Sequence, residues 1–159
     1  LSRKSVLLKC KGFDTNMNCC IDYDFWLRVA WLGANFHYLN DGIFVLYRLR
    51  NNSLSSSSKE FSSNGIYSLK KFSKVKEQMD ETTKKLYEEA FYDWIFKRGR
   101  AIYESGNYFK GLIEMFKGLT KSRGKNTIYK ICFFILVIFI NPKSADKALI
   151  RIKSYLKRN

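Results

Sequence analysis

The chain has 159 residues, of which 46% are hydrophobic and 16% aromatic, and 29 basic against 14 acidic side chains give it a formal charge of +15. This composition excludes a globally disordered chain, and the length is enough for one domain with a real core, or one domain plus an extension. A charge this large predicts a polyanionic partner, which is nucleic acid, an anionic membrane surface or a phosphorylated substrate.

The placement of the charge helps to choose between these partners. Residues 121–159 carry ten basic side chains and one acidic side chain, Asp146, around an apolar run. Nucleic-acid binders more often spread their charge over a face with polar and aromatic residues interleaved. A basic tail around an apolar run favours binding to an anionic membrane surface, and we expect no nucleic-acid partner.

Four cysteines and one histidine, His37, give little support for a metal site, because the cysteines show no Cys-x-x-Cys spacing. We expect structural thiols in a reducing compartment.

The first predicted elements are two short helices. Residues 2–11 form an amphipathic pattern that Gly12 ends, since glycine suits the left-handed position after a helix. Residues 13–16 have turn chemistry. The stretch "CIDYDFWLRVAWLG", Cys20 to Gly33, predicts a helix of about three turns that Gly33 stops.

Two β-prone runs follow, Asn35 to Leu39 and Ile43 to Leu49, with Asn40-Asp41-Gly42 between them. Asp-Gly between such runs predicts a β-hairpin. Residues 51–64 are polar and serine-rich, which is typical of a flexible loop or the edge of a domain.

The last half of the chain is predicted to be helical. Residues 81–120 have helical periodicity interrupted at Ser105-Gly106-Asn107, which predicts an antiparallel hairpin of two helices, and the hairpin resembles a single tetratricopeptide-like unit. Residues 131–140, "ICFFILVIFI", would rise roughly 15 Å as a helix, about half of a hydrocarbon core. They are either a buried core helix or strand, or a segment lying in a membrane interface. The basic, amphipathic residues 145–156 slightly favour the interface.

Two carboxylates open the helix at 20–33. On a helical wheel Asp22 falls with the apolar face, whereas Asp24 falls on the opposite side beside Arg28. For Asp24 we expect a solvent-side pair with Arg28, worth a few tenths of a kcal/mol. Asp22 is either a first-turn acid favoured by the helix dipole, or a carboxylate between core and cleft whose pKa is raised by desolvation and which acts as a general base.

Residues 2–58 resemble the acceptor-side half of a family 2 glycosyltransferase of the GT-A fold. The resemblance rests on Gly12-Phe13-Asp14, on Asp22-Tyr23-Asp24-Phe25-Trp26-Leu27-Arg28, on Gly33 and on Tyr47-Arg48, all in the order and spacing of that family. It covers about a third of the chain. Two positions depart from the family pattern, because Ile21 replaces a glutamate and Arg50 replaces a histidine.

The resemblance implies an inverting, nucleotide-sugar-dependent transferase of cell-surface polysaccharide synthesis, acting on a glycan or a lipid-linked acceptor. It makes Asp22 the catalytic base. Tyr23 and Trp26 either bind the substrate, since aromatic faces suit sugar rings, or pack in the core. Arg48, and Arg50 as a fixed cation in place of the histidine, are further candidate substrate-binding residues. It also implies Mg²⁺ or Mn²⁺ at an Asp-x-Asp motif in a nucleotide-binding half that precedes these residues in the family. We expect this chain to lack that half, to bind no metal and to be inactive alone.

The expected fold is therefore an α/β fragment, the C-terminal part of a GT-A domain with helices and a short β-hairpin, followed by a mainly α-helical extension. The expected parts are the domain portion at 1–58, a polar linker at 59–80, the helical hairpin at 81–121, and a basic, apolar, membrane-associating tail at 122–159. We expect a cytoplasmic location, peripheral at the inner face of the cell membrane. The rival interpretation is a non-catalytic, membrane-associated interaction module, which Ile21 and Arg50 favour.

Overall fold

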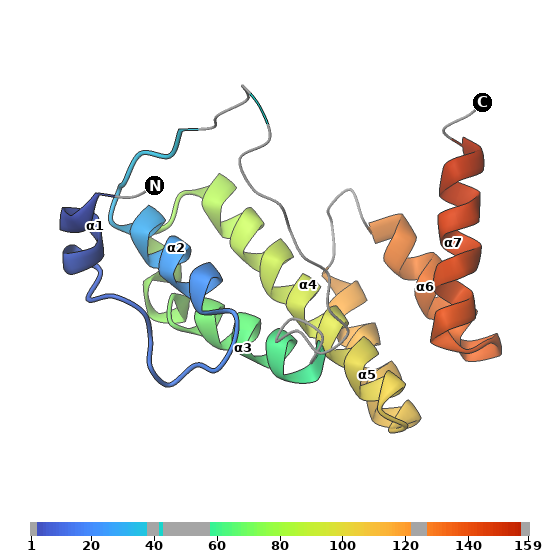
Figure 1. Cartoon of the computed structure of the whole chain (residues 1–159). Helices are drawn as coiled ribbons and strands as arrows, with labels where there is room; N and C mark the ends of the chain where they lie inside the picture. Colours follow the sequence, from blue (N-terminus) through green and yellow to red (C-terminus); the bar gives the residue numbers. More distant parts are fainter. Residues whose placement is uncertain (1–2, 38–41, 43–57, 122–126, 157–159) are drawn as a thin grey trace. The chain divides into compact units, whose positions relative to one another are not determined.

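The computed structural model describes residues 3–37, 42, 58–121 and 127–156, and its regular elements are helices (Figure 1). The helices are α1 (Lys4–Lys9), α2 (Ile21–Trp31), α3 (Ser58–Lys70), the 3₁₀ helix η2 (Ser73–Gln78), α4 (Glu81–Glu104), α5 (Tyr108–Thr120), α6 (Thr127–Phe139) and α7 (Pro142–Leu156). They divide into two compact units, residues 1–74 and residues 75–159.

The predicted α/β class is wrong for the part of the chain that the structure describes, because that part contains helices and turns and no strand. Residues 35–37, the start of the first predicted strand, have no regular structure, and Phe36 is exposed. The rest of the hairpin, apart from Gly42, lies outside the described residues. Strand propensity measures how well a side chain fits a half-buried sheet, and a lone two-stranded hairpin is marginal without a further layer.

In the first unit, α1 and α2 enclose a small core. Cys10, Phe25 and Val29 are buried together, and the ring of Phe13 lies 5.0 Å from that of Phe25. Gly33 follows α2 with a φ of 74°, in the left-handed region that favours glycine, so the predicted stop is confirmed. The four cysteines are free thiols, as expected.

Helix α3 lies in the segment that was expected to be a polar linker. Its apolar residues Ile66 and Leu69, with Phe72 beyond its end, are buried. Its buried hydroxyls bond to the helix's own carbonyls: Ser62 donates to Lys59 and Ser68 donates to Asn64. Because these serines satisfy themselves locally, a serine-rich sequence can form a packed helix here.

In the second unit, α4 and α5 form the predicted antiparallel hairpin, with the break at residues 105–107. Three glycines, Gly99, Gly111 and Gly118, let the two helices approach closely, because a Cβ at any of them would lie within 2.9 Å of atoms on the facing helix. The N-terminus of α4 is capped by Asp80, which accepts hydrogen bonds from the backbone N–H groups of Thr82 and Thr83.

Helices α6 and α7 complete the second unit as another hairpin. Phe133 and Val137 of α6 join a core with Phe96, Met115, Ala145 and Leu149. Partly buried ion pairs tie these helices to α4, since Lys130 binds Asp93 and Arg100 binds Asp146. The 131–140 run is thus a helix with one face in the protein core, while Ile131, Ile135 and Ile138 on its other face are exposed.

Within the described residues, every helix is too short or too polar to cross a membrane. The 13 residues of α6 would rise only about 20 Å, against about 30 Å for a hydrocarbon core.

Candidate functional site

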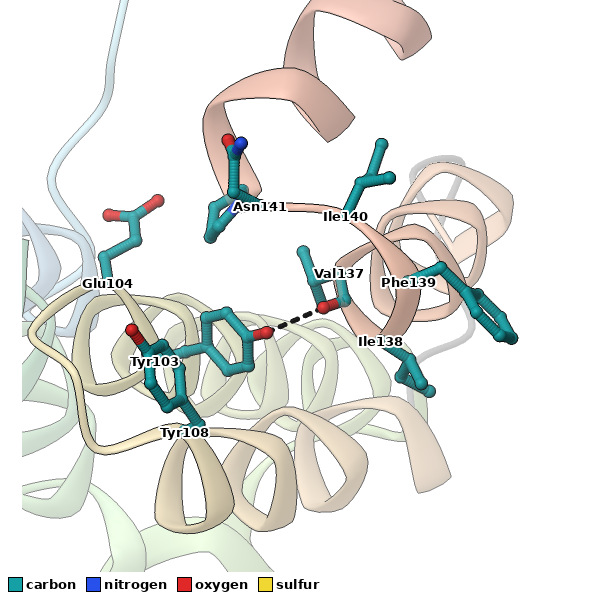
Figure 2. Close-up of a pocket in the computed structure, with 9 residues that line it drawn as sticks. Tyr103, Glu104, Tyr108, Val137, Ile138, Phe139, Ile140 and Asn141 are labelled. Carbon is teal, nitrogen blue, oxygen red and sulfur yellow. Dashed lines mark hydrogen bonds between the residues drawn. The ribbon is translucent and has the colours of Figure 1, made fainter.

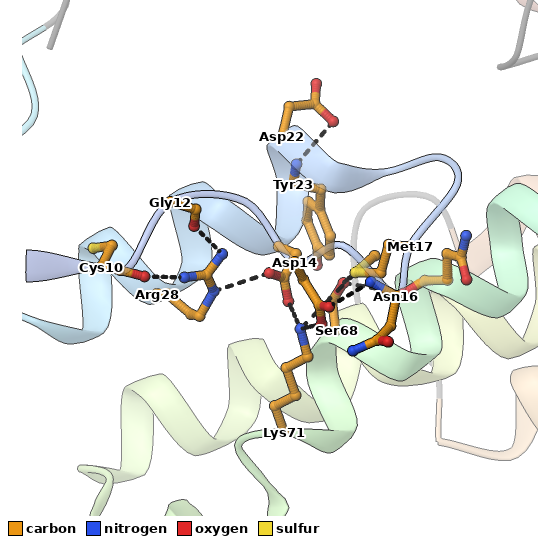
Figure 3. A network of polar contacts seen from close by, with 12 residues as sticks. Cys10, Gly12, Asp14, Asn16, Met17, Asp22, Tyr23, Arg28, Ser68 and Lys71 are labelled. Carbon is orange, nitrogen blue, oxygen red and sulfur yellow. Dashed lines mark hydrogen bonds and ion pairs between the residues drawn. The ribbon is translucent and has the colours of Figure 1, made fainter. Parts of the chain in front are cut away.

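The candidate site surrounds the start of α2, where residues 10–20 wrap over the helix and are held by α3 (Figure 3). Three polar residues, spaced four and three apart, face this loop: Asn64 and Ser68 of α3, and Lys71 directly after its end. The amide of Asn64 donates to the carbonyl of Cys19 at 3.2 Å. The hydroxyl of Ser68 lies 4.0 Å from the sulfur of Met17. One face of α3 therefore fixes the loop that leads into α2.

Asp24 lies at the centre of a charged cluster and is completely buried, with 0% of its surface exposed. Its Oδ2 accepts from Nε of Arg28 at 2.9 Å, and its Oδ1 accepts from Nζ of Lys71 at 2.5 Å. Both carboxylate oxygens are paired with cations, which compensates the burial of the charge.

Arg28 and Lys71 extend the cluster to the loop after α1. The guanidinium of Arg28 donates to the carbonyls of Cys10 and Gly12, at 2.5 and 2.9 Å. Lys71 also donates to Oδ2 of Asp14 at 2.6 Å. We name Asp14, Asp24, Arg28 and Lys71 the Asp24 cluster. It locks the Gly12-Phe13-Asp14 turn, α2 and the end of α3 together.

The electrostatics of the cluster follow from these contacts. The hydrogen bond from Lys71 holds the pKa of Asp14 below its ordinary value, and a backbone hydrogen bond from Asn16 adds to this. Burial lowers the pKa of Lys71, but the hydrogen bonds to Asp14 and Asp24 outweigh burial, so the pKa of Lys71 is raised. Both groups are therefore held in their charged forms around neutral pH.

Asp22 lies outside the Asp24 cluster. It is exposed in the first turn of α2, and Figure 3 shows its side chain pointing away from the cluster. Its Oδ1 accepts from the backbone N–H of Tyr23 at 2.8 Å. Among the described side chains, Asp22 therefore presents a carboxylate to solvent at the positive end of a helix.

The predicted orientation of the two carboxylates is wrong, because Asp24 rather than Asp22 faces the core. The predicted pairing of Asp24 with Arg28 is confirmed, but the pair is inside the protein rather than on the solvent side. A helical wheel ranks the faces of a helix from that helix's own residues, so it takes no account of Lys71, which approaches Asp24 from 47 positions away. Of the two positions considered for Asp22, it occupies the exposed first turn of the helix and not a boundary between core and cleft.

The aromatic candidates lie near Asp22. Trp26, one helical turn after Asp22, is 43% exposed, and its ring contacts those of Phe25 and Phe36 edge-on at 4.9 and 6.0 Å. Tyr23 is half-buried. The predicted donor-side residues Arg48 and Arg50 lie outside the described residues. Of the candidates, the structure therefore brings together Asp22, Tyr23 and Trp26 on one helix.

Asp22-Tyr23-Asp24 has the spacing of an Asp-x-Asp motif, but its two carboxylates do not converge. Residues two apart on a helix lie on nearly opposite sides, and Asp24 is already paired with two cations. In the described part of the chain, no cluster of three or more histidine, cysteine or acidic side chains could hold a metal ion. These residues therefore do not fit the divalent metal that the resemblance implies.

Lys71 is the member of the site that sequence reasoning missed. It was assigned to a linker, and no local motif marks it. The sequence pattern that could have indicated it is the three-residue spacing of the apolar Ile66 and Leu69, which predicts a helix with one buried face in this segment.

A second concave feature lies in the second unit, between the α4–α5 turn and the α6–α7 connection (Figure 2). It has a volume of about 360 Å³. The ring of Tyr108 contacts that of Tyr103 edge-on, and the hydroxyl of Tyr103 donates to the carbonyl of Val137 at 2.7 Å. None of the predicted site residues lines this pocket. The hydroxyl of Tyr103 is already used in the hydrogen bond that joins α4 to α6.

Comparisons with protein-family models, with curated proteins and with solved structures find no match to this chain.

Proposed function

We propose that residues 2–58 supply the acceptor side of a nucleotide-sugar-dependent glycosyltransferase, with Asp22 as the general base. The carrying observation is the division of roles between the carboxylates of α2. Asp24 is committed to the Asp24 cluster, whereas Asp22, two residues earlier, is exposed on the same rigid helix. A base needs this combination of a fixed backbone and an accessible oxygen.

The Asp24 cluster supports this proposal through positioning. Its ion pairs hold the start of α2 against the loop after α1 and against α3. A carboxylate in the first turn of a helix fixed in this way has little freedom apart from its own rotamers. The cluster therefore acts on Asp22 through the backbone, and its members are positioning residues.

Trp26 supports the proposal through the chemistry of its ring. Positions four apart on a helix share a face, so Trp26 and Asp22 lie on the same side of α2. A partly exposed aromatic ring gives a flat apolar surface on which a sugar ring can pack. Tyr23 adds a second aromatic side chain at the same helix start.

In the proposed reaction, an oxygen of Asp22 takes the proton of an acceptor hydroxyl while that hydroxyl attacks the anomeric carbon of the donor sugar. The new glycosidic C–O bond forms as the bond to the nucleoside diphosphate breaks, and the diphosphate leaves with the bonding electrons. Attack from the face opposite the leaving group inverts the anomeric configuration. The Asp22 carboxyl then returns its proton to solvent.

The proposal places the donor site, with its nucleotide-binding half and Mg²⁺ or Mn²⁺, outside the described residues of this chain. Arg48 and Arg50 are proposed to contact the donor diphosphate as fixed cations. We also propose a cytoplasmic enzyme held peripherally at the inner face of the cell membrane by residues 122–159.

The test starts from the reading frame around the codon for Leu1. A continuous frame that encodes a β-α-β unit with Asp-x-Asp is expected upstream, and its full product should transfer sugar from one of a panel of nucleotide-sugars. Asp22→Asn in that product should lower kcat by about 10³-fold or more and leave the Kd of the nucleotide-sugar unchanged. Glu81→Gln, at an exposed first-turn acid of α4, is the matched control and should retain kcat.

Three results would contradict the proposal or a part of it. Retained turnover by the Asp22→Asn protein would remove the base assignment. A stop codon directly upstream, together with no transfer by any form of the protein, would favour the rival interaction module. Sugar transfer by the 159-residue chain alone would contradict the placement of the donor site outside it.

A further inference from the structure

Two rows of exposed apolar side chains run along neighbouring helices of the second unit. On α6 the row has helical spacing and consists of Ile128, Ile131, Ile135 and Ile138. On α5 it consists of Phe109, Ile113 and Phe116, of which Phe109 is 78% exposed. Large apolar side chains gathered on one surface, rather than scattered singly, mark a place where a protein meets a partner or a membrane.

The two rows form one surface because they meet at an aromatic contact. The ring of Phe116 on α5 lies 6.2 Å from that of Phe134 on α6. Phe134 is half-buried, and on the wheel it adjoins Ile131, about 60° away. Met115 and Phe133, on the inner sides of the same two helices, share the core. We name the two rows together the α5–α6 apolar surface.

The outward direction of the α6 isoleucines is fixed by polar contacts on the opposite side of the helix. Lys130 is buried and binds Asp93 of α4, and the carbonyl of Val137 accepts from Tyr103. Rolling α6 so as to bury Ile131 and Ile135 would break both contacts and would place the Lys130 ammonium elsewhere without its carboxylate. The exposure of the row is therefore a built feature of this unit.

The charge around the surface identifies its partner. Lys110, Lys117 and Lys121 follow the α5 row along one side of the helix, and all three are exposed. Lys143 and Lys147 of α7 are also exposed and add to the positive charge of the second unit. Apolar side chains flanked by lysines match the boundary of an anionic bilayer, where the chains enter the headgroup region and the ammonium groups meet lipid phosphates.

We infer that the α5–α6 apolar surface is the face with which this protein lies on an anionic membrane, with α5 and α6 parallel to the bilayer plane. This inference rests on the peripheral membrane location proposed above and specifies its side chains. The membrane contact was expected in the tail at 122–159 alone. The inference adds the helical hairpin to it, through Phe109, Ile113 and Phe116 of α5.

The experiment measures flotation of the full chain with vesicles of phosphatidylglycerol and phosphatidylcholine, and with vesicles of phosphatidylcholine alone. Phe116→Ser and Ile135→Ser should each lower the partition coefficient on the anionic vesicles about tenfold, and the double variant about a hundredfold. Binding should be weak on phosphatidylcholine alone and should fall as salt is added, because the lysine contribution is screened.

Leu86→Ser is the matched control. Leu86 of α4 is 61% exposed, against 58% for Phe116, and it lies outside the α5–α6 apolar surface. It should bind vesicles like the parent chain. Circular dichroism melting of each variant separates loss of binding from loss of fold, and unchanged melting is expected because all these side chains are exposed.

Three outcomes would overturn the inference. The double variant could bind anionic vesicles fully, while replacement of the α7 lysines abolishes binding. The protein would then still bind the membrane, but not through the α5–α6 apolar surface. No binding of any form to anionic vesicles would remove the membrane location as well. A lipid-free dimer that Ile135→Ser dissociates would make a second copy of the chain the occupant. None of these experiments measures sugar transfer, so their results do not depend on whether Asp22 is the general base.

Discussion

The ammonium of Lys71 lies 2.5 Å from Oδ1 of Asp24, 47 positions earlier in the chain, and this contact determines which face of α2 is inside the protein. With Arg28 on its other oxygen, Asp24 can be buried with its charge compensated. Asp22 has no such cation among the residues that the structure describes, and it remains at the surface. The two acids of one helix turn thus acquire opposite roles through a residue that directly follows another helix, α3.

The first prediction concerns stability. Asp24→Asn should lower the free energy of unfolding of the first unit by about 3 kcal/mol, because it leaves Lys71 and Arg28 without their buried carboxylate. Asp22→Asn, an isosteric change at an exposed position, should change it by less than about 0.5 kcal/mol. Urea unfolding in a Trp94→Phe background measures this, since Trp26 and Trp31 then report on the first unit. Equal losses for the two variants would contradict the assignment of the buried face.

The second prediction concerns acid. The pKa of Asp14 is lowered by Lys71, and the pKa of Glu114 is lowered, against the effect of burial, by Arg98. A carboxylate with a lowered folded pKa stabilises the fold fully above its unfolded pKa of about 4, and this stabilisation is lost as the pH falls through the folded pKa. The free energy of unfolding should therefore stay nearly constant between about pH 5 and 8 and decrease below about pH 4.

The control for this pH dependence is Lys71→Met. It should flatten the acid decline of the first unit, because Asp14 then has a pKa closer to that of the unfolded chain. Urea midpoints measured across the acid range check both results. An unchanged acid decline in the Lys71→Met protein would show that the Asp14 pair is not its source.

The third prediction concerns the α4–α5 hairpin. Gly111→Ala would place a Cβ 2.6 Å from the backbone of Tyr103. Alanine stabilises a helix by about 1 kcal/mol relative to glycine. Overpacking against a backbone costs more, about 1–3 kcal/mol. We expect a net destabilisation of the second unit, seen as a lower melting temperature by circular dichroism. Lys117→Ala, at an exposed position of the same helix, should change the melting temperature little, and a gain in stability for Gly111→Ala would contradict the close approach.

The fourth prediction concerns the acceptor. In the complete transferase, Trp26→Ala should raise the acceptor KM about three- to tenfold, which corresponds to loss of one aromatic face from the site. Trp31, with 42% exposure against 43% for Trp26, contacts Phe72 on another side of α2 and provides the matched control. Trp31→Ala should leave the acceptor KM unchanged. Equal effects of the two changes would assign Trp26 a packing role alone.

The sequence predicted most of the local structure. The helical spacing and the glycines gave α1, α2, α4 and α5 with nearly correct bounds, because apolar periodicity and helix-ending residues act over a few positions. It failed at α3, where serines that bond to their own helix concealed a buried face. It also failed for the predicted strand start at residues 35–37, since strand propensity is realised only against a partner sheet.

For the candidate site, the sequence by itself determined that Asp22 and Asp24 stand in the first turn of a helix, that Arg28 lies one turn from Asp24, and that Trp26 shares a side with Asp22. Only the tertiary structure decided which acid is buried. The free energy of a buried carboxylate depends on the cations that reach it in space. One of those that reach Asp24 is Lys71, which follows a helix that the local pattern did not reveal.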